Sequence, residues 1–314
     1  MSSIGIGIGA GLVSALLFGV VITGSPLAML LSYLAPLPVL IAALGWRHGA
    51  GLFATLAGGV ATALAFRPEA GLAFAIGSGL PGWWIAFLAL LGRPRPDGAM
   101  EWYPLGRLLL WVAGVAALVT LAGVMALGDG DYEGYRTGLR RALETMLPAT
   151  NEAQATARGT ILDALVTAVP LVASAVFVLV FVLNLWIAAK VVRISERLPR
   201  PWPAVAATVM PRQALLILAG AAVLCFLPGF AGAAGLGLLG ALVIAFALQG
   251  LGLLHEATRG RNGRVGILTA TYVLIAFVGH TVLPLFALVG IADTAMPLRA
   301  RFRSGSAGPG SPST

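Results

Sequence analysis

Charged side chains are scarce in this sequence. Only 10% of the 314 residues are Asp, Glu, Lys or Arg, whereas 59% are hydrophobic, and the mean hydropathy is +0.94. Soluble domains carry about 25% charged residues, so the composition argues against a cytosolic enzyme, a nucleic-acid-binding protein and a disordered chain. It predicts an integral membrane protein that is built from several apolar helices and surrounded by the lipid bilayer.

Cysteine and catalytic motifs are also lacking. The single cysteine, Cys225, lies in an apolar run, which excludes an intrachain disulfide and a cysteine-based metal site. The sequence has no GxSxG, HExxH, Walker A or CxxC motif, and its three histidines are far apart. We therefore expect no catalytic residues, no metal site and no cofactor, that is, a protein that is not an enzyme.

Long apolar runs dominate what is present. A membrane-spanning helix needs about 20 mostly apolar residues, and the first run has no basic residue ahead of it, which favours a retained span over a cleavable signal. We expect an all-α, polytopic transmembrane helical bundle of eight or nine spans, with residues 1–303 as one transmembrane domain. The candidate spans are 4–24, 27–45, 49–66, 70–92, 105–127, 162–190, 212–227, 230–254 and 266–291.

Two segments are expected outside the membrane. Within the polar connection 128–161, apolar side chains recur at helical spacing, which predicts an amphipathic helix at the interface. The Gly, Ser and Pro content of residues 304–314 predicts a disordered tail.

Basic residues lie mainly between the apolar runs and give a net charge of +8. With the N-terminus in the cytoplasm, the inner loops hold more of these residues than the outer loops, as the positive-inside rule requires. The cluster Arg299, Arg301 and Arg303 argues against this orientation, because nine spans would place it outside. An even number of spans would place it inside, and the sequence leaves this conflict open.

Small residues recur every four positions along the first span, at Gly7, Gly11, Ala15 and Gly19. Such ridges allow helix backbones to approach closely in a bilayer. The ridge has two interpretations, a docking surface for a partner subunit or ordinary packing inside the bundle.

A ligand site is expected where helices are broken and polar side chains lie deep. Pro36 and Pro38 interrupt the second span, and unwound backbone at membrane depth often lines transporter sites. Asn184, Gln249 and His280 are the polar residues expected within spans. The alternative is a packing kink and hydrogen bonds between helices.

Four stretches in this order resemble the YybS-like family of bacterial membrane proteins, whose function is unknown. They are PLPVLIAALGWRHG (36–49), VPLVASAVFVLVFVLNLWIAAKVV (169–192), LQGLGLLHEATRGRNGRVGILTATYVLI (248–275) and VGIADTAMPLRAR (289–301). The resemblance implies a multi-pass protein of the bacterial inner membrane. It also implies a fold-level similarity to the substrate-binding subunits of energy-coupling-factor transporters, in which a small-residue first helix docks on a coupling subunit.

Two functions follow as hypotheses. The first is a transporter-like subunit that binds a small, mostly apolar or neutral molecule near Pro36, Pro38, Asn184, Gln249 and His280. The second is a non-catalytic scaffold in envelope assembly that docks a partner through the Gly7–Gly19 ridge. The expected partners are the bilayer and either a coupling protein or an envelope-assembly membrane protein, and no nucleic acid.

Overall fold

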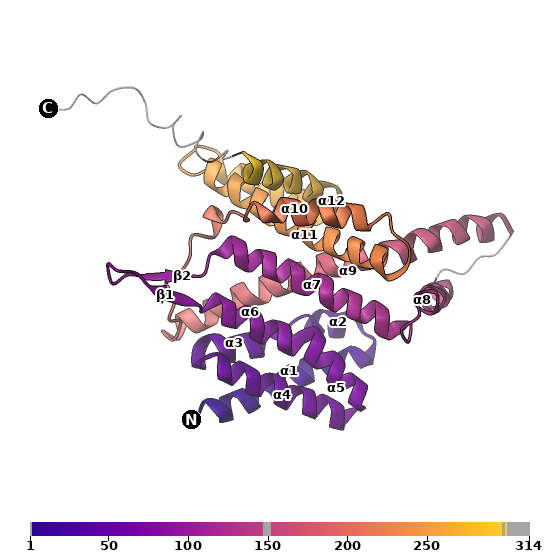
Figure 1. Ribbon diagram of the computed structural model, residues 1–314, viewed down its shortest axis with the longest axis horizontal. Helices are drawn as coiled ribbons and strands as arrows, with labels where there is room; N and C mark the ends of the chain where they lie inside the picture. Colours follow the sequence, from indigo (N-terminus) through magenta and orange to yellow (C-terminus); the bar gives the residue numbers. More distant parts are fainter. Residues whose placement is uncertain (1, 147–151, 297–298, 300–314) are drawn as a thin grey trace.

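The computed structural model describes residues 2–146, 152–296 and 299, and it confirms the all-α, polytopic helical bundle (Figure 1). Eight helices or continuous helix pairs are long and apolar enough to cross a membrane. The helices in the first half are α1 (Ser3–Gly19), η1 (Val20–Thr23), α2 (Pro26–Ser32), α3 (Pro36–Trp46), α4 (His48–Ala65), α5 (Pro68–Phe74), η2 (Ala75–Gly79), α6 (Leu80–Ala89) and α7 (Leu105–Leu127). Those in the second half are α8 (Tyr132–Met146), α9 (Glu152–Ile194), η3 (Val205–Ala207), α10 (Gln213–Leu224), α11 (Gly229–Ala257) and α12 (Arg264–Ala295).

The described strands form one short antiparallel hairpin, β1 (Gly92–Pro94) with β2 (Met100–Trp102), between α6 and α7. An ion pair between Arg93 and Glu101, with a 2.7 Å Nε–Oε2 distance, joins the two strands. This pair lowers the pKa of the Glu101 carboxyl and raises the pKa of the Arg93 guanidinium, chiefly through the hydrogen bond between them.

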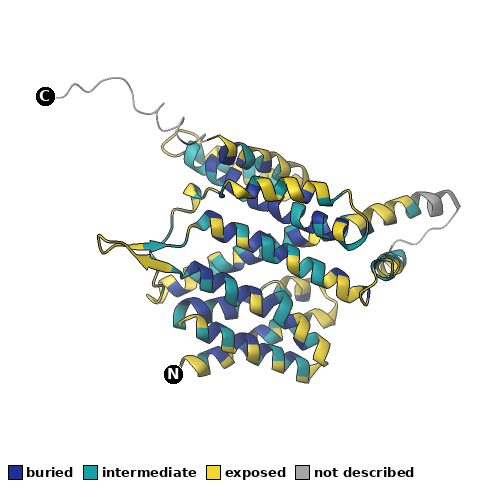
Figure 2. Ribbon diagram, viewed as in Figure 1, coloured by how far each residue is buried: buried dark blue, intermediate teal, exposed yellow. Residues whose placement is uncertain are grey.

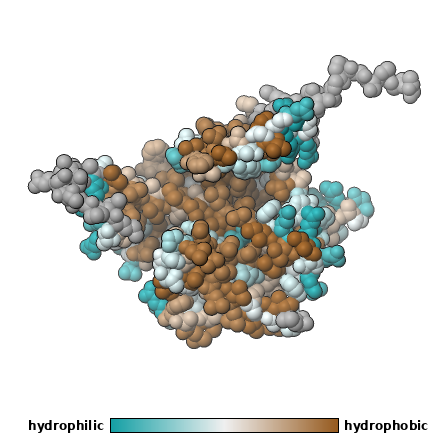
Figure 3. Space-filling view, turned by 180° about the vertical axis from the view of Figure 1, so that it is seen from behind, coloured by the Kyte–Doolittle hydropathy of each residue, from teal (hydrophilic) through white to brown (hydrophobic). Residues whose placement is uncertain are grey.

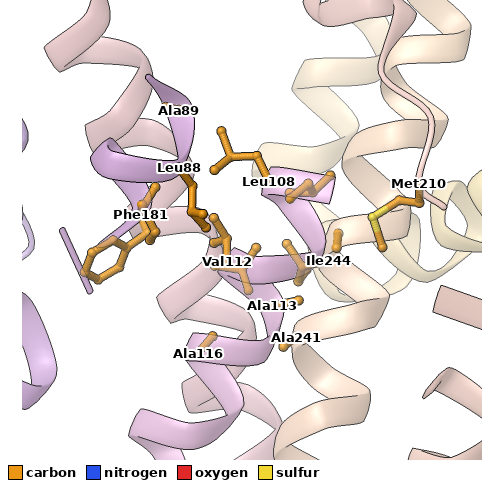
Figure 4. Close-up of a cluster of buried hydrophobic side chains, with 14 of the residues drawn as sticks. Leu88, Ala89, Leu108, Val112, Ala113, Ala116, Phe181, Met210, Ala241 and Ile244 are labelled. Carbon is orange, nitrogen blue, oxygen red and sulfur yellow. The ribbon is translucent and has the colours of Figure 1, made fainter. Parts of the chain in front are cut away.

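The core lies where α6, α7, α9 and α11 meet. Figure 4 shows Val112 and Ala113 of α7 beside Ala241 and Ile244 of α11, and Met210 reaches the same cluster from the segment before α10. All five side chains are buried. The alanines keep the helix axes close together, which favours dispersion contacts in a bilayer, where no hydrophobic effect drives helix association.

Apolar side chains also cover the outer surface. Buried residues occupy the centre of the bundle and exposed residues its periphery (Figure 2), and the surface seen from behind is mostly hydrophobic (Figure 3). Leu64, Phe226 and Phe277 are 84%, 90% and 83% exposed. Because such a surface would aggregate in water, its natural environment is the hydrocarbon core of a bilayer.

The seventh expected span, 212–227, differs from a regular crossing. Its helix, α10, has 12 residues, which amounts to about 18 Å against a hydrocarbon thickness of about 30 Å. Yet α9 and α11 run in the same direction, since Leu171 lies against Gly240 while Leu185 and Gln249 share one cavity wall further along. The chain between them must therefore cross the bundle, and the irregular segment 195–212 supplies the remaining length.

The ninth expected span, 266–291, lies in a helix that folds back. Val278 has non-helical angles (φ −133°, ψ 37°) and divides α12 into two halves. A straight helix of 32 residues would be about 48 Å long. However, Arg264 donates to His255 O (3.1 Å) and Arg299 contacts Glu256 (2.7 Å), so both ends of α12 lie beside the same end of α11 (Figure 1).

The fold-back places Arg299 at the end of the bundle where many other basic residues lie. Helices α1 and α4 run in parallel, since Gly7 lies against Ala50 and Gly11 against Ala54, so the N-terminal end of α1 is at the Arg47 end of α4. Arg197 stacks on Trp46 (4.7 Å), which places the end of α9 there too. The residues at this basic end are Arg47, Arg93, Arg95, Arg107, Lys190, Arg193, Arg197, Arg200, Arg259, Arg261, Arg264 and Arg299.

At the opposite end, α8 occupies much of the expected amphipathic connection 128–161. Tyr135 of this helix is buried in a small cluster with Val124 and Ala233. The remainder of the connection includes the start of α9 at Glu152. The expected disordered tail, 304–314, and residues Arg301 and Arg303 lie outside the described residues.

Candidate functional site

The small-residue ridge of α1 faces the chain's own α4. A Cβ atom at Gly7 would lie 2.6 Å from Ala50 O, and one at Gly11 would collide with Ala54 O. Gly19 lies against the ring of Phe66, and Ala15 is half-buried. The contacts are therefore those of packing within the bundle, and a partner protein does not reach Gly7 or Gly11 while α4 is in place.

The break before Pro36 is stabilised by two side chains from other helices. Pro36 and Pro38 occupy the first turn of α3, where a missing N–H removes no helical hydrogen bond. Asn184 of α9 donates through Nδ2 to Tyr33 O (2.9 Å), and the Ser14 hydroxyl donates to Ala35 O. The unwound carbonyls are thus satisfied inside the protein, as a bilayer requires.

A cavity of about 540 Å³ adjoins this break, between α2, α3, η2 and α9. Pro36 lies in its wall, as does Ser78 of the π-helical turn η2, whose buried hydroxyl has no hydrogen-bond partner among the described residues. Asn184 lies behind Val180 and Phe181, which line the cavity.

Gln249 of α11 is the centre of a second, separate polar group. Its Nε2 donates to Asp293 Oδ2 (2.8 Å) and Gly290 O (3.2 Å), and its Oε1 accepts from Met210 N (2.9 Å). The Thr294 hydroxyl is also within 3.2 Å of Oε1. One buried amide therefore connects α11, the end of α12 and the irregular segment before α10.

Arg299 completes this group. Its Nε contacts Asp293 Oδ2 at 2.9 Å and its Nη1 contacts Glu256 Oε2 at 2.7 Å. The same guanidinium donates to Ala206 O (2.6 Å) and Thr208 O (2.9 Å). These bonds satisfy two backbone carbonyls of the irregular segment, which has few hydrogen bonds of its own.

His280 lies apart from both groups. It is exposed, two residues beyond the bend at Val278. The expected site residues therefore occupy three places in the structure: Pro36 and Asn184 at one break, Gln249 at another, and His280 on the outer surface.

A second cavity, of about 450 Å³, lies between α7, α9, α11 and the segment 198–208. We call it the central cavity. Its wall is almost entirely apolar and includes Leu108, Val112, Leu185 and Ala189, and Gln249 lies at its edge. The other polar side chains in the wall are Arg200, Thr208, His255 and Tyr272.

Arg200 is the charged side chain of this wall. It is half-buried and donates from Nη1 to Ala89 O (3.0 Å) at the end of α6. His255 and Tyr272, at the α11–α12 side, share a 2.8 Å hydrogen bond.

Sequence reasoning assigns Gln249 to a site but not Arg299, Asp293 or Arg200. Arg299 and Arg200 follow apolar runs, where basic residues ordinarily mark loops and topology. The one signal was the sequence DTAMPLR, which places a carboxylate and a guanidinium six residues apart near a helix end. Within the described ranges, no group of three His, Cys, Asp or Glu side chains could hold a metal ion.

Comparison with known proteins agrees with this architecture. No curated protein and no solved structure matches the chain. A family of predicted membrane proteins, DUF2232, matches residues 12–294, which extend from the first helix to Thr294 beside Gln249. The chain therefore belongs to the DUF2232 family of predicted membrane proteins.

Proposed function

We propose that this membrane protein binds a small, mostly apolar molecule in the central cavity, as a transporter-like binding subunit. The observation that carries the proposal is the cavity itself, about 450 Å³ in volume and walled mainly by apolar side chains of α7, α9 and α11. Ligand pockets have this size and character, with few polar groups that fix orientation. No catalytic step is part of the proposal.

The expected similarity to YybS-like proteins and to energy-coupling-factor binding subunits belongs to this proposal and motivates the search for a coupling partner. The scaffold alternative rested on the α1 ridge, which α4 covers. A scaffold would have to dock through lipid-facing surfaces such as the first half of α12, which is exposed along most of its length.

We also propose a bacterial inner-membrane location in which the basic end of the bundle faces the cytoplasm. The positive-inside rule supports this orientation, and the fold-back of α12 brings Arg299 to the same end as Arg47. The N-terminus is then cytoplasmic, and the position of Arg299 agrees with that assignment.

Native mass spectrometry of the gently purified protein tests the proposed function. Ala189→Phe adds a ring inside the cavity, whereas Leu183→Phe adds one to an exposed position of the same helix. We expect a discrete small-molecule adduct on the wild type and on Leu183→Phe, and its loss from Ala189→Phe. An adduct that Ala189→Phe retains would contradict binding in this cavity.

A further inference from the structure

Arg200 lies in the wall of the central cavity, where it forms no ion pair with any residue that the structure describes. Among residues 2–146, 152–296 and 299, no carboxylate lies within ion-pair distance of its guanidinium, which donates to the carbonyl of Ala89. Glu196, the acidic residue nearest in sequence, is exposed. The half-buried Arg200 guanidinium therefore has N–H groups that bind no carboxylate of the described residues.

Arg299 provides a comparison, because its guanidinium has the carboxylate partners that Arg200 lacks among the described residues. Arg299 is more deeply buried than the half-buried Arg200, and it contacts two carboxylates, Asp293 and Glu256, and two carbonyls. A buried charge costs free energy unless it is paired. An anion that enters the cavity beside Arg200 would supply the missing partner in a site of low dielectric constant, where a charged hydrogen bond is strong.

The surroundings of Arg200 favour an anion attached to an apolar chain. Trp186 and Trp202 line the same cavity; the Lys190 ammonium lies 5.2 Å from the Trp186 ring centroid, and the Arg193 guanidinium lies 5.0 Å from that of Trp202. Tryptophan and basic side chains together are typical of the interface where lipid headgroups lie. Beyond them the wall is apolar, through Leu108, Val112 and other aliphatic side chains.

We propose that the ligand is a single-chain anionic amphiphile, whose chain fills the central cavity and whose carboxylate or phosphate binds Arg200. The inference rests on the proposed function and adds the charge of the ligand to it. Fatty acids and single-chain lipid phosphates share this chemistry. The apolar cavity accommodates the hydrocarbon chain of the ligand, and the Arg200 guanidinium favours a negatively charged headgroup.

Equilibrium binding of radiolabelled probes to the purified protein tests the proposal. The probes are dodecanoate, dodecyl phosphate and the uncharged dodecanol, which share one chain. The variants are Arg200→Gln, which keeps a donor for Ala89 O, and Arg200→Lys, which keeps the charge. Arg197→Gln is the matched control, because Arg197 is a nearby basic residue that stacks on Trp46 outside the cavity wall.

We expect the wild type to prefer the anionic probes over dodecanol by about tenfold, since a charged hydrogen bond contributes that order of affinity. Arg200→Gln should lose this preference while its dodecanol affinity stays within about twofold, and Arg200→Lys and Arg197→Gln should retain the preference. The probe that binds more tightly, dodecanoate or dodecyl phosphate, identifies the anionic group.

Three results would overturn the inference. The first is equal wild-type affinity for dodecanol and the anions, and the second is an equal loss of anion preference in Arg197→Gln and Arg200→Gln. Either result would show that Arg200 does not bind the anionic group. The proposed function would still hold if Ala189→Phe abolishes binding. Binding of no probe by the wild type would contradict the amphiphile, and the native mass spectrum then decides separately whether the cavity holds another molecule. If Arg200→Gln does not fold, the inference is tested by the preference of the wild type and of Arg200→Lys for the anionic probes over dodecanol.

Discussion

Arg299 and Asp293 form a buried ion pair, with a 2.9 Å Nε–Oδ2 distance, at the point where α12 returns to the end of α11. The same guanidinium binds the carbonyls of Ala206 and Thr208 in the irregular segment. The pair therefore joins the two irregular features of the bundle, the broken seventh crossing and the folded-back last helix. Arg299, four residues beyond the end of α12, therefore binds the last turn of that helix and the irregular backbone before α10 at the same time.

Removal of one partner of this pair should destabilise the protein strongly. Arg299→Gln leaves the Asp293 carboxylate buried without its cation, and breaking a buried pair in this way costs about 3–5 kcal/mol. We expect a decrease of several degrees in the apparent melting temperature, measured by tryptophan fluorescence in one detergent.

The double variant Asp293→Leu/Arg299→Met should be more stable than Arg299→Gln, because it removes the deeply buried Asp293 carboxylate together with its cation. Arg261→Gln, at an exposed position of the same end, serves as the control and should change stability by less than about 0.5 kcal/mol. An Arg299→Gln protein as stable as Arg261→Gln would show that the pair does not hold the two segments together.

Gly11 and Gly9 offer a matched test of the α1–α4 contact. A Cβ atom at Gly11 would collide with Ala54 O, whereas one at Gly9 meets nothing within 4 Å. Gly11→Ala should therefore separate the two helices and cost about 1–3 kcal/mol. Gly9→Ala should be neutral or slightly stabilising, because alanine favours the helix.

Thermal unfolding of both variants in the same detergent provides the measurement. If the ridge served only to dock a separate protein, Gly11→Ala would leave the isolated chain as stable as Gly9→Ala, and the structural assignment of the ridge to internal packing would be wrong.

The fold class follows from the sequence because hydropathy and length determine which segments a bilayer can hold. The same pattern does not distinguish a straight span from a bent one. The run 266–291 is apolar enough for a crossing, but the helix turns back at Val278. Pro284 removes one helical hydrogen bond near this turn, yet a proline signals a kink without its angle or direction.

The site was predictable in its residue types but not in its assembly. Gln249 is recognisable as a deep polar residue, whereas its partner atoms belong to Met210, Asp293 and Thr294, which lie 39 to 45 positions away. Arg200 could not be identified from sequence, because a basic residue beside tryptophan and proline is typical of an interfacial loop. That it has no carboxylate partner among the described residues is evident only in the packed structure.

Reporter fusions test the fold-back of α12. With both ends of α12 beside the same end of α11, a reporter at the C-terminus should lie on the same side of the membrane as one at the N-terminus, and both should be cytoplasmic. A reporter inserted after Gly130, in the loop that precedes α8, should lie on the opposite side. A C-terminal reporter found with the Gly130 reporter would mean that α12 crosses the membrane.

Tyr135 predicts how stability depends on alkaline pH. Its side chain is buried in α8, its hydroxyl has no partner among the described residues, and burial, aided by the nearby Tyr132, raises its pKa from 10 to about 12. Between these values the unfolded chain loses a proton that the folded protein keeps, so the free energy of unfolding decreases as the pH rises through this window. Below pH 10 the Tyr135 hydroxyl keeps its proton in both states, so its ionisation does not lower the free energy of unfolding there.

Tyr135→Phe should remove this part of the alkaline decline, because phenylalanine keeps the packing with Val124 and Ala233 but has no ionisable group. At neutral pH the variant should be as stable as the wild type or more so, since an unpaired buried hydroxyl costs about 1–3 kcal/mol. Tyr33→Phe, at an exposed position, should keep the wild-type decline. Apparent melting temperatures on both sides of pH 10 decide the matter, because an equal decline in all three proteins would mean that the burial of Tyr135 contributes nothing to the pH dependence.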